Sequence, residues 1–230
     1  MAKDQVAEIL YEDNHLIVIN KPCGIPVQPD ESGDKSLLEY MKDYIKEEYK
    51  KPGEVYLGLI HRLDRPVSGA VVMAKTSKAL TRMNEMFQKR DVQKTYWALT
   101  KNKPQNDDET LTHYLIKDHE KNSSKAFNKE KKGTKKAVLD YKFKGRLGEK
   151  FLLEVDLHSG RHHQIRVQLA KVGLNIIGDF RYGYKRPNKD RSICLHARRL
   201  TFIHPIKKEQ IDIIADLPRS SFWQDFVGME

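Results

Sequence analysis

The sequence contains few cysteines and no long apolar segment, and both absences narrow the class of protein. The two cysteines, Cys23 and Cys194, lie far apart in the chain, so they form neither a disulfide framework nor a Cys-x-x-Cys metal site. No apolar run approaches the roughly 20 residues that a membrane-spanning helix needs. Residues 1–5 lack the apolar stretch of a secretory signal peptide. We therefore expect a cytoplasmic protein with no membrane partner, and we expect it to be a monomer.

Signatures of bound cofactors and metals are also missing. The chain has no glycine-rich phosphate loop and no His-Glu-x-x-His motif. His162 and His163 are adjacent and stand near the expected start of a helix, so we expect their side chains to point in different directions and not to share a metal ion. The sequence thus predicts neither a metal nor a cofactor.

Positive charge is in excess. Lys plus Arg number 42 against 32 Asp plus Glu, which gives a net charge of +10 and favours an anionic partner such as nucleic acid or an acidic membrane surface. Seven lysines and a single acid, Glu130, fall within residues 121–136. We interpret residues 101–136, which are polar and poorly periodic, as a lysine-rich insertion. It is either a solvated surface segment, which the lysine run alone favours, or a flexible basic arm that contacts phosphates.

Hydrophobic residues make up 39% of the chain, which is enough for a core in one large domain or two small ones. We expect a helix at 37–49 with a Ser36/Glu39 capping box and a second helix capped by Ser77, in which Leu80, Met83 and Phe87 share a face. A third helix is expected around Ile165, Leu169 and Val172, and Gly173 can end it. Short apolar or alternating runs predict strands at 16–19, 56–60, 70–74, 94–99, 151–157, 193–200 and 211–214. No repeat and no linker clearly divides the chain.

The motif His61-Arg62-Leu63-Asp64-Arg65-Pro66-Val67-Ser68-Gly69 places one acid between two arginines, on a loop between apolar segments. Nearby guanidinium groups favour the ionised form of a carboxyl group. An oriented carboxylate can act as nucleophile, general base or metal ligand. Taken alone, this motif is more often an ion pair in a solvated turn.

Two further motifs carry candidate functional residues. Lys94-Thr95-Tyr96-Trp97-Ala98 is an expected strand, and Ser159-Gly160-Arg161-His162-His163-Gln164-Ile165-Arg166 leads into an expected helix. By themselves, Tyr96 reads as a half-buried strand tyrosine and Arg166 as a helix-surface arginine.

Together, the three motifs resemble the RluA-type pseudouridine synthases, a group of RNA pseudouridylate synthases. Supporting stretches lie at 19–24, 178–183 and 195–205, and the resemblance spans about residues 10–217. It implies an α+β fold, with a mixed, largely antiparallel central sheet flanked by helices and loops around a catalytic cleft. It also implies an isomerase (an intramolecular transferase) that converts specific uridines in structured tRNA or rRNA to pseudouridine.

The resemblance implies roles for individual residues. Asp64 matches the catalytic aspartate, Tyr96 the active-site tyrosine, and Arg166 the arginine that pairs with that aspartate. Arg62 matches the arginine that helps to fill the gap left by a flipped nucleotide. The candidate RNA-binding residues are mainly basic and come from the first motif, the third motif and the insertion: Arg62, Arg65, His61, Arg161, His163, Lys131, Lys132, Lys135 and Lys136.

The sequence departs from the family pattern at two positions, since Val67 stands where threonine is usual and Gln168 where histidine is common. Both departures bear on the geometry of the site and leave the three chemical roles intact. Members of the family often carry a small amino-terminal RNA-binding domain. Because the catalytic pattern begins near Leu10, we expect a single catalytic domain over residues 1–230 with no such domain before it.

Two other hypotheses remain open at this point: a non-catalytic RNA-binding protein on the same scaffold, and a metal-dependent nuclease that uses Asp64. The nuclease would need a second carboxylate from among Asp91, Asp140, Glu154 and Asp179, none of which lies in a recognisable acidic motif. For the isomerase, the residues do not choose between Asp64 as covalent nucleophile and Asp64 as base.

Overall fold

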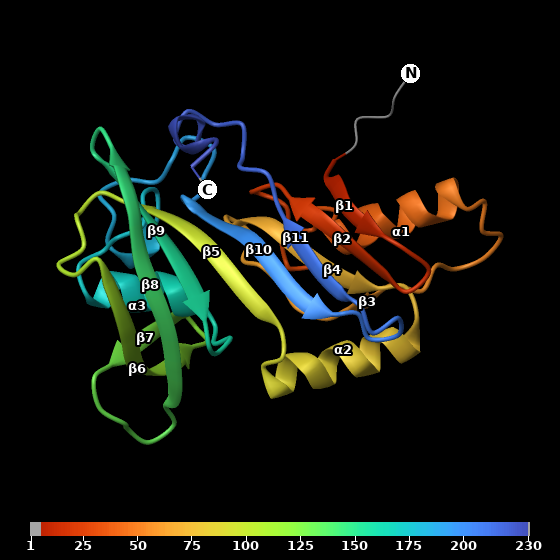
Figure 1. The fold of residues 1–230 in the computed structure, drawn as a ribbon, viewed down its shortest axis with the longest axis horizontal. Helices are drawn as coiled ribbons and strands as arrows, with labels where there is room; N and C mark the ends of the chain where they lie inside the picture. Colours follow the sequence, from red (N-terminus) through yellow and green to blue (C-terminus); the bar gives the residue numbers. More distant parts are fainter. Residues whose placement is uncertain (1–5, 230) are drawn as a thin grey trace. The chain divides into compact units, whose positions relative to one another are not determined.

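A computed structural model describes residues 6–229, which form two compact units (Figure 1). The first unit contains the described residues up to Gln93 together with Ala197–Pro218. The second unit contains Lys94–His196 and the carboxyl-terminal residues from Arg219.

The first unit is built on a sheet whose strands come from both ends of the chain. Its strand order is β1-β2-β4-β10, with β11 paired to β10 and β3 paired to β4. The strands are β1 (Glu8–Glu12), β2 (Leu16–Lys21), β3 (Gly58–Leu59), β4 (Ser68–Ala74), β10 (Leu195–Ile203) and β11 (Gln210–Ile214). The β1–β2, β2–β4, β3–β4 and β10–β11 pairs are antiparallel. The strand expected over residues 56–60 is thus shortened to two residues.

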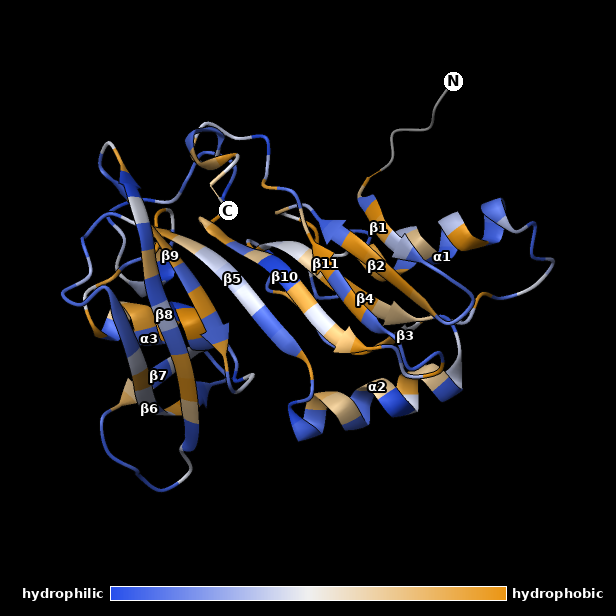
Figure 2. Cartoon of the chain, in the orientation of Figure 1, coloured by the Kyte–Doolittle hydropathy of each residue, from blue (hydrophilic) through white to orange (hydrophobic). Residues whose placement is uncertain are grey.

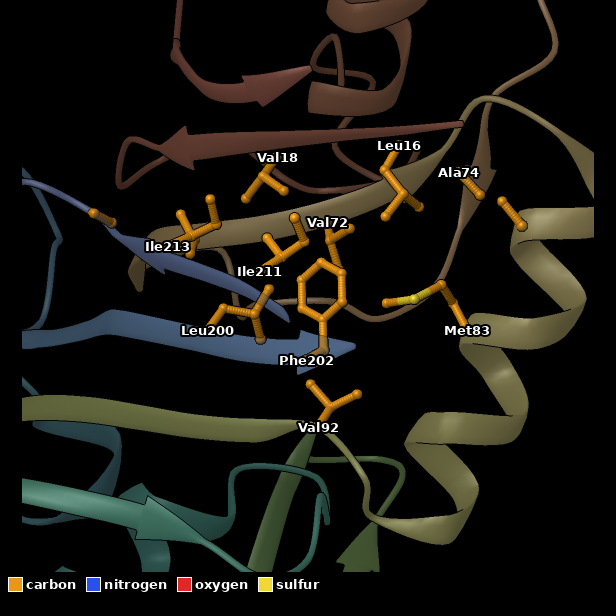
Figure 3. Packing of buried hydrophobic residues seen from close by; sticks show 13 residues of the cluster. Leu16, Val18, Val72, Ala74, Met83, Val92, Leu200, Phe202, Ile211 and Ile213 are labelled. Atoms are coloured by element: carbon orange, nitrogen blue, oxygen red, sulfur yellow. The ribbon is translucent and has the colours of Figure 1, made fainter. Parts of the chain in front are cut away.

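The core of the first unit forms because β2 and β4 are apolar along almost their whole length and are buried on both faces. Figure 2 shows both strands mainly in hydrophobic colours. One cluster joins Leu16 and Val72 on these strands to Phe202 on β10 and Met83 on α2 (Ser77–Lys89). In Figure 3 the Phe202 ring lies at the centre of this cluster. The buried strands give the loops that leave them a rigid support.

The two helices of the first unit begin at side-chain caps. The Ser36/Glu39 capping box predicted for α1 (Leu37–Glu48) is confirmed, since each side chain bonds to the other's backbone amide. The predicted cap of α2 was wrong by one residue. Thr76 caps α2 and accepts from the Ala79 N–H at 3.3 Å, and Ser77 is the first helical residue.

The second unit is an antiparallel sheet in the order β5-β9-β8-β6-β7. Its strands are β5 (Gln93–Thr100), β6 (Asp108–Asp118), β7 (Ser123–Phe127), β8 (Lys135–Leu147) and β9 (Lys150–Leu157). Helix α3 (Gln164–Lys171) packs against β6 and β7 and against the short helix η1 (Phe180–Tyr182). A second short helix, η2 (Gln224–Phe226), lies near the carboxyl terminus. The strands and helices of the two units confirm the predicted α+β fold with largely antiparallel strands.

The lysine-rich insertion has more regular structure than the sequence predicted. Residues 101–136 contain β6 and β7 and the first residues of β8, so the segment forms a hairpin in the sheet and is not an irregular arm. On β6 every second residue is buried, with Leu111, His113 and Leu115 facing α3. The other face is mixed, with Thr110 and Thr112 followed by Tyr114 and Ile116, so the alternation is weak in the sequence. Figure 2 shows the same change of colour along β8, a strand that was not predicted.

Within residues 6–229, no helix has the length and apolarity to cross a membrane.

Candidate functional site

Asp64 lies on a tight turn between β3 and β4. Its carbonyl accepts the Val67 N–H at 3.0 Å, and the neighbouring Leu63 and Val67 side chains are buried. The Asp64 side chain is partly exposed. Just beyond the turn, Gly69 has φ +114°, and a Cβ there would lie 2.5 Å from the Ala197 backbone nitrogen on β10. Only glycine fits at this position near the start of β4. The close packing of Gly69 against β10 therefore fixes where the Asp64 turn joins β4.

A fully buried lysine ties the end of β2 to this turn. The Lys21 ammonium donates to the carbonyl oxygens of Pro22 at 2.9 Å, Ile25 at 2.9 Å and Arg65 at 3.2 Å. Burial lowers the pKa of Lys21 to about 7, against the opposing influence of Cys23 and Asp64. Lys21 is not among the predicted site residues, although a lysine at the end of an apolar strand, directly before a proline, is a detectable signal.

Arg65 holds a neighbouring loop. Its Nε donates to the Gly24 carbonyl at 2.8 Å and its Nη1 to the Ser32 hydroxyl at 2.9 Å, and it forms an ion pair with Asp34. In return, the Arg65 carbonyl accepts the Gly24 N–H at 2.9 Å. These contacts assign Arg65 a structural role beside Asp64. Its predicted contact with RNA is untested.

His61 and Arg62 differ in their surroundings. The His61 Nε2 accepts the Val72 N–H at 3.1 Å, and its ring stacks on Phe87 with centroids 5.0 Å apart. A ring nitrogen that accepts a backbone N–H is unprotonated, so His61 anchors the turn as a neutral side chain. Arg62 is exposed, as a residue that meets RNA must be.

Arg166, on α3, is buried and paired within its own unit. Its Nε lies 2.7 Å from Asp179 Oδ2 and its Nη2 lies 2.8 Å from Asp179 Oδ1, while the guanidinium rests 5.0 Å from the Tyr182 ring centroid. Arg166 is 5% exposed and Asp179 1% exposed. The prediction of a surface arginine is thus excluded, and Asp179 has a role that sequence reasoning missed. The only signal in the sequence for this role of Asp179 is that it lies in the stretch 178–183, which supports the family resemblance.

The prediction that the His162 and His163 side chains point in different directions was wrong. Their rings stack with centroids 3.8 Å apart, because His163 adopts a left-handed backbone conformation with φ +53°. Tyr182 accepts the Ser124 N–H at 2.8 Å, and its hydroxyl lies 2.8 Å from His163 Nδ1. Burial and the nearby Arg166 lower the pKa of His163 to about 2, so the ring is neutral and Nδ1 accepts from Tyr182.

Tyr96 lies on β5, opposite Val155 of β9, and is 8% exposed. Its position on β5, paired with β9, fixes the direction of the ring, which suits a stacking platform as well as a core residue.

The basic candidates of the insertion and of the third motif come together. Lys131, Lys132, Lys135 and Lys136 are exposed, with Lys131 stacked over the Phe127 ring at 4.1 Å. The Arg161 Nε donates to the Lys136 carbonyl at 3.3 Å. The fold therefore joins two basic groups that lie far apart in the sequence.

Gln168, the departure from the family pattern, is fully buried. Its Nε2 donates to the Leu111 carbonyl at 3.0 Å and lies 3.1 Å from His113 Nδ1, so it fastens α3 to β6. Its contacts are structural.

Three of the carboxylates that a nuclease could use lie in the second unit, and each accepts a hydrogen bond from a neighbouring side chain. Asp179 binds Arg166, Asp140 accepts from the Thr110 hydroxyl at 2.7 Å, and Glu154 accepts from the Trp97 indole at 3.3 Å. Over residues 6–229, no group of three or more His, Cys, Asp or Glu side chains is arranged to hold a metal ion.

Asp64 belongs to the first unit, whereas Tyr96 and Arg166 belong to the second. The predicted pairing of Asp64 with Arg166 therefore stays a prediction.

Comparisons with known proteins place these features in a family. The family model for RNA pseudouridylate synthase matches residues 15–171. Ribosomal large subunit pseudouridine synthase C of Buchnera aphidicola subsp. Schizaphis graminum is 33% identical over 222 residues, which cover 94% of this chain and 68% of that relative. tRNA pseudouridine synthase C of Haemophilus influenzae is 30% identical over 242 residues, which cover 96% of each protein. The solved structure of human RNA pseudouridylate synthase domain containing 4 matches with a TM-score of 0.77 and 25% identity, over 92% of this chain and 88% of that one.

The chain belongs to the RNA pseudouridylate synthase family, as the RluA-type motifs predicted. It is an RNA pseudouridine synthase, an enzyme that isomerises uridine in RNA to pseudouridine.

Lys21→Met tests whether this lysine fastens the Asp64 turn. The substitution removes a donor shared by three part-buried carbonyls, of which that of Arg65 also accepts the Gly24 N–H, and we expect unfolding to become easier by about 2 kcal/mol or more. Lys35→Met is the control, since Lys35 forms an exposed ion pair with Asp43 whose loss costs only about 0–1 kcal/mol.

The pH dependence sharpens this test. Because the folded pKa of Lys21 is about 7 and the unfolded value is 10.5, the unfolded parent binds more protons between these values, and the parent gains stability as pH rises through that window. The deficit of Lys21→Met, measured by urea unfolding, should therefore grow from pH 7 towards pH 10. A deficit that shrinks with rising pH would show that the charged ammonium is the stabilised form.

Asp179→Asn tests the partner of Arg166. Removing one member of a buried ion pair leaves an uncompensated charge, so we expect a loss of about 3–5 kcal/mol in urea unfolding. The matched control is Asp212→Asn, which breaks a similarly paired but exposed contact with Arg199 and should cost about 1 kcal/mol or less. Equal losses in the two variants would contradict a special role for Asp179.

Proposed function

We propose that this enzyme acts on specific uridines of structured tRNA or rRNA, and that Asp64 is its catalytic residue. The main support is the anchored Asp64 turn, which falls inside the region matched by the family model. The names of the two relatives point to ribosomal RNA in one case and to tRNA in the other, so both substrate classes fit.

The reaction needs a well-placed carboxylate and no redox partner. The bond between uracil N1 and ribose C1′ breaks, the base rotates, and a bond forms between C5 and C1′. The proton on C5 is lost and N1 gains one, so atoms and electrons balance within the nucleotide. Asp64 serves either as the nucleophile that attacks the ribose or as the base that allows the glycosidic bond to break.

The nucleotide must leave its stack before Asp64 can act on it. Flipping a uridine out of a stem-loop costs a few kcal/mol, which contacts to the flipped base and to the gap must repay. We propose that Tyr96 stacks on the uracil and that Arg62, exposed next to Asp64 in the sequence, fills the gap.

We further propose that Arg166 keeps Asp64 ionised and correctly oriented. The planar guanidinium offers donors in fixed directions. Asp179 engages the Nε and Nη2 edge and Tyr182 covers the face, so the orientation of the group is set before RNA binds. A lysine at this position would keep the charge and lose the fork.

Binding to RNA draws on the excess positive charge. The net charge of +10 and the exposed insertion lysines suit contacts to phosphates, which are independent of base identity. We expect Lys131, Lys132, Lys135, Lys136, Arg161 and His163 to contribute. A monomeric, cytoplasmic protein remains our expectation.

Asp64→Asn tests the catalytic assignment in the purified protein. A carboxamide is a poor nucleophile and a poor base, so we expect no detectable pseudouridine in tRNA or rRNA, measured by mass spectrometry of the digested RNA. Because a negative charge near RNA is removed, affinity should equal or exceed that of the parent.

The matched control is Asp91→Asn, which removes an exposed acid from the same unit and should leave turnover unchanged. Thermal melting confirms that each variant is folded before turnover is compared. Parent-like turnover in a folded Asp64→Asn protein would show that another residue carries the chemistry. A parent that binds RNA and modifies none of it would favour the binding-protein hypothesis.

A further inference from the structure

A hollow of about 420 Å³ opens on the second unit beside the first residues of α3. It lies between the β6–β7 hairpin, the start of β8 and the loop that precedes α3. Its polar lining consists of Lys117, His119, Ser124, Lys135, Arg161 and His162. Lys135 and Arg161 are among the expected RNA contacts, whereas none of the proposed catalytic residues lines this hollow.

The strand register explains why cations line it. On β6, Leu111, His113 and Leu115 face α3, and Lys117 continues the same face. Lys135 of β8 lies opposite Leu115, and Ser124 of β7 lies opposite Lys117. The face that is apolar beneath α3 therefore becomes basic where the helix begins.

Hydrogen bonds hold the walls of the hollow in place. The Ser124 hydroxyl donates to the His162 carbonyl at 2.7 Å and lies 2.9 Å from His162 Nδ1. Because that hydroxyl has one proton, the His162 ring nitrogen must be the donor in the second contact. Arg161 is fixed by its Nε contact to the Lys136 carbonyl. The site is thus largely formed before any ligand arrives.

This hollow and a second one on the same unit differ in the charge of the side chains that line them. No acidic side chain lines the first hollow. The second, of about 280 Å³, is lined by Asp108, Glu109, Asp140, Glu154 and Asp156, with Lys142 as its single cation. An anion is therefore attracted to the first hollow and repelled from the second.

The form of the basic hollow suits a polymer and not a small anion. Its lysine and arginine side chains are exposed, and exposed charges bind an isolated phosphate weakly in water. A polyanion engages several of them together and releases its condensed counterions. We propose that this hollow seats backbone phosphates of the RNA substrate, an inference that rests on the proposed function.

This placement would connect RNA binding to Arg166. The Ser124 N–H donates to the Tyr182 hydroxyl, and the Tyr182 ring lies against the Arg166 guanidinium. RNA seated in the hollow therefore contacts the hydrogen-bonded group that holds Arg166 in position.

The test compares two double variants that each remove two positive charges from the second unit. Lys117→Gln/Lys135→Gln alters the basic hollow. Lys142→Gln/Lys144→Gln, on the same strand as Lys135, alters lysines that lie beside acids, because Lys142 lines the acidic hollow and Lys144 is 3.8 Å from Glu154. Binding of labelled unfractionated tRNA and rRNA is measured by fluorescence anisotropy at several salt concentrations.

For the hollow variant we expect affinity to fall about 10-fold at moderate salt, and the slope of log affinity against log salt to become shallower by about 1–2, since each lost phosphate contact contributes about 0.7–0.9. The control variant should keep the parent's slope. Equal slopes in all three proteins, or equal losses in the two variants, would overturn the proposal. Displacement of RNA by about 1 mM inorganic phosphate at constant ionic strength would also overturn it, by indicating a site for free phosphate.

Pseudouridine formation by the parent is measured in the same RNA samples. If the parent forms pseudouridine while the slopes are equal, the proposed function stands and the hollow is excluded. If the parent forms none, the proposed function fails, and the slopes still decide whether the hollow binds RNA.

Discussion

The buried Lys21 is the contact on which the candidate site depends. An ammonium group withdrawn from water is costly, and here three carbonyls offset part of that cost. One of the three belongs to Arg65, directly after Asp64, so the same group that satisfies the lysine also fixes the turn. The end of a central strand and a partly exposed carboxylate thereby become one rigid structure. Rigid support of this kind is what a catalytic side chain needs, because small displacements of a reacting group cost large factors in rate.

The second unit repeats this design with an arginine. Arg166 is as buried as a core residue, and Asp179 neutralises it while Tyr182 covers its face. Both units therefore carry a buried cation that has hydrogen-bond partners within its own unit. In each case the supporting residues are local, so they are in place before RNA is bound. Because these side chains are already ordered in the folded protein, the free-energy cost of ordering them falls on folding and does not add to the activation barrier of the reaction.

The sequence predicted the elements whose pattern is carried by apolar residues. The strands β2 and β4 and the capping box of α1 were predicted correctly because continuous apolar runs and a Ser-x-x-Glu spacing are strong local signals. The strands β6 and β8 were missed because both lie in polar sequence: β6 begins and ends with an acid, and β8 carries several lysines among its apolar residues. Lys21 and Asp179 were missed for a different reason, since the value of a buried charge depends on partners that only the fold brings near. The motif residues themselves were found through their resemblance to a family, and the stacking of His162 on His163 was not, because it follows from one unusual backbone conformation.

The central claim is that this protein makes pseudouridine in cellular RNA. It is tested most directly by mapping pseudouridines at single-nucleotide level in the tRNA and rRNA of cells with and without the gene. The account predicts that at least one position loses its pseudouridine on deletion and regains it when the gene is restored. An unchanged map in both classes of RNA would contradict the account.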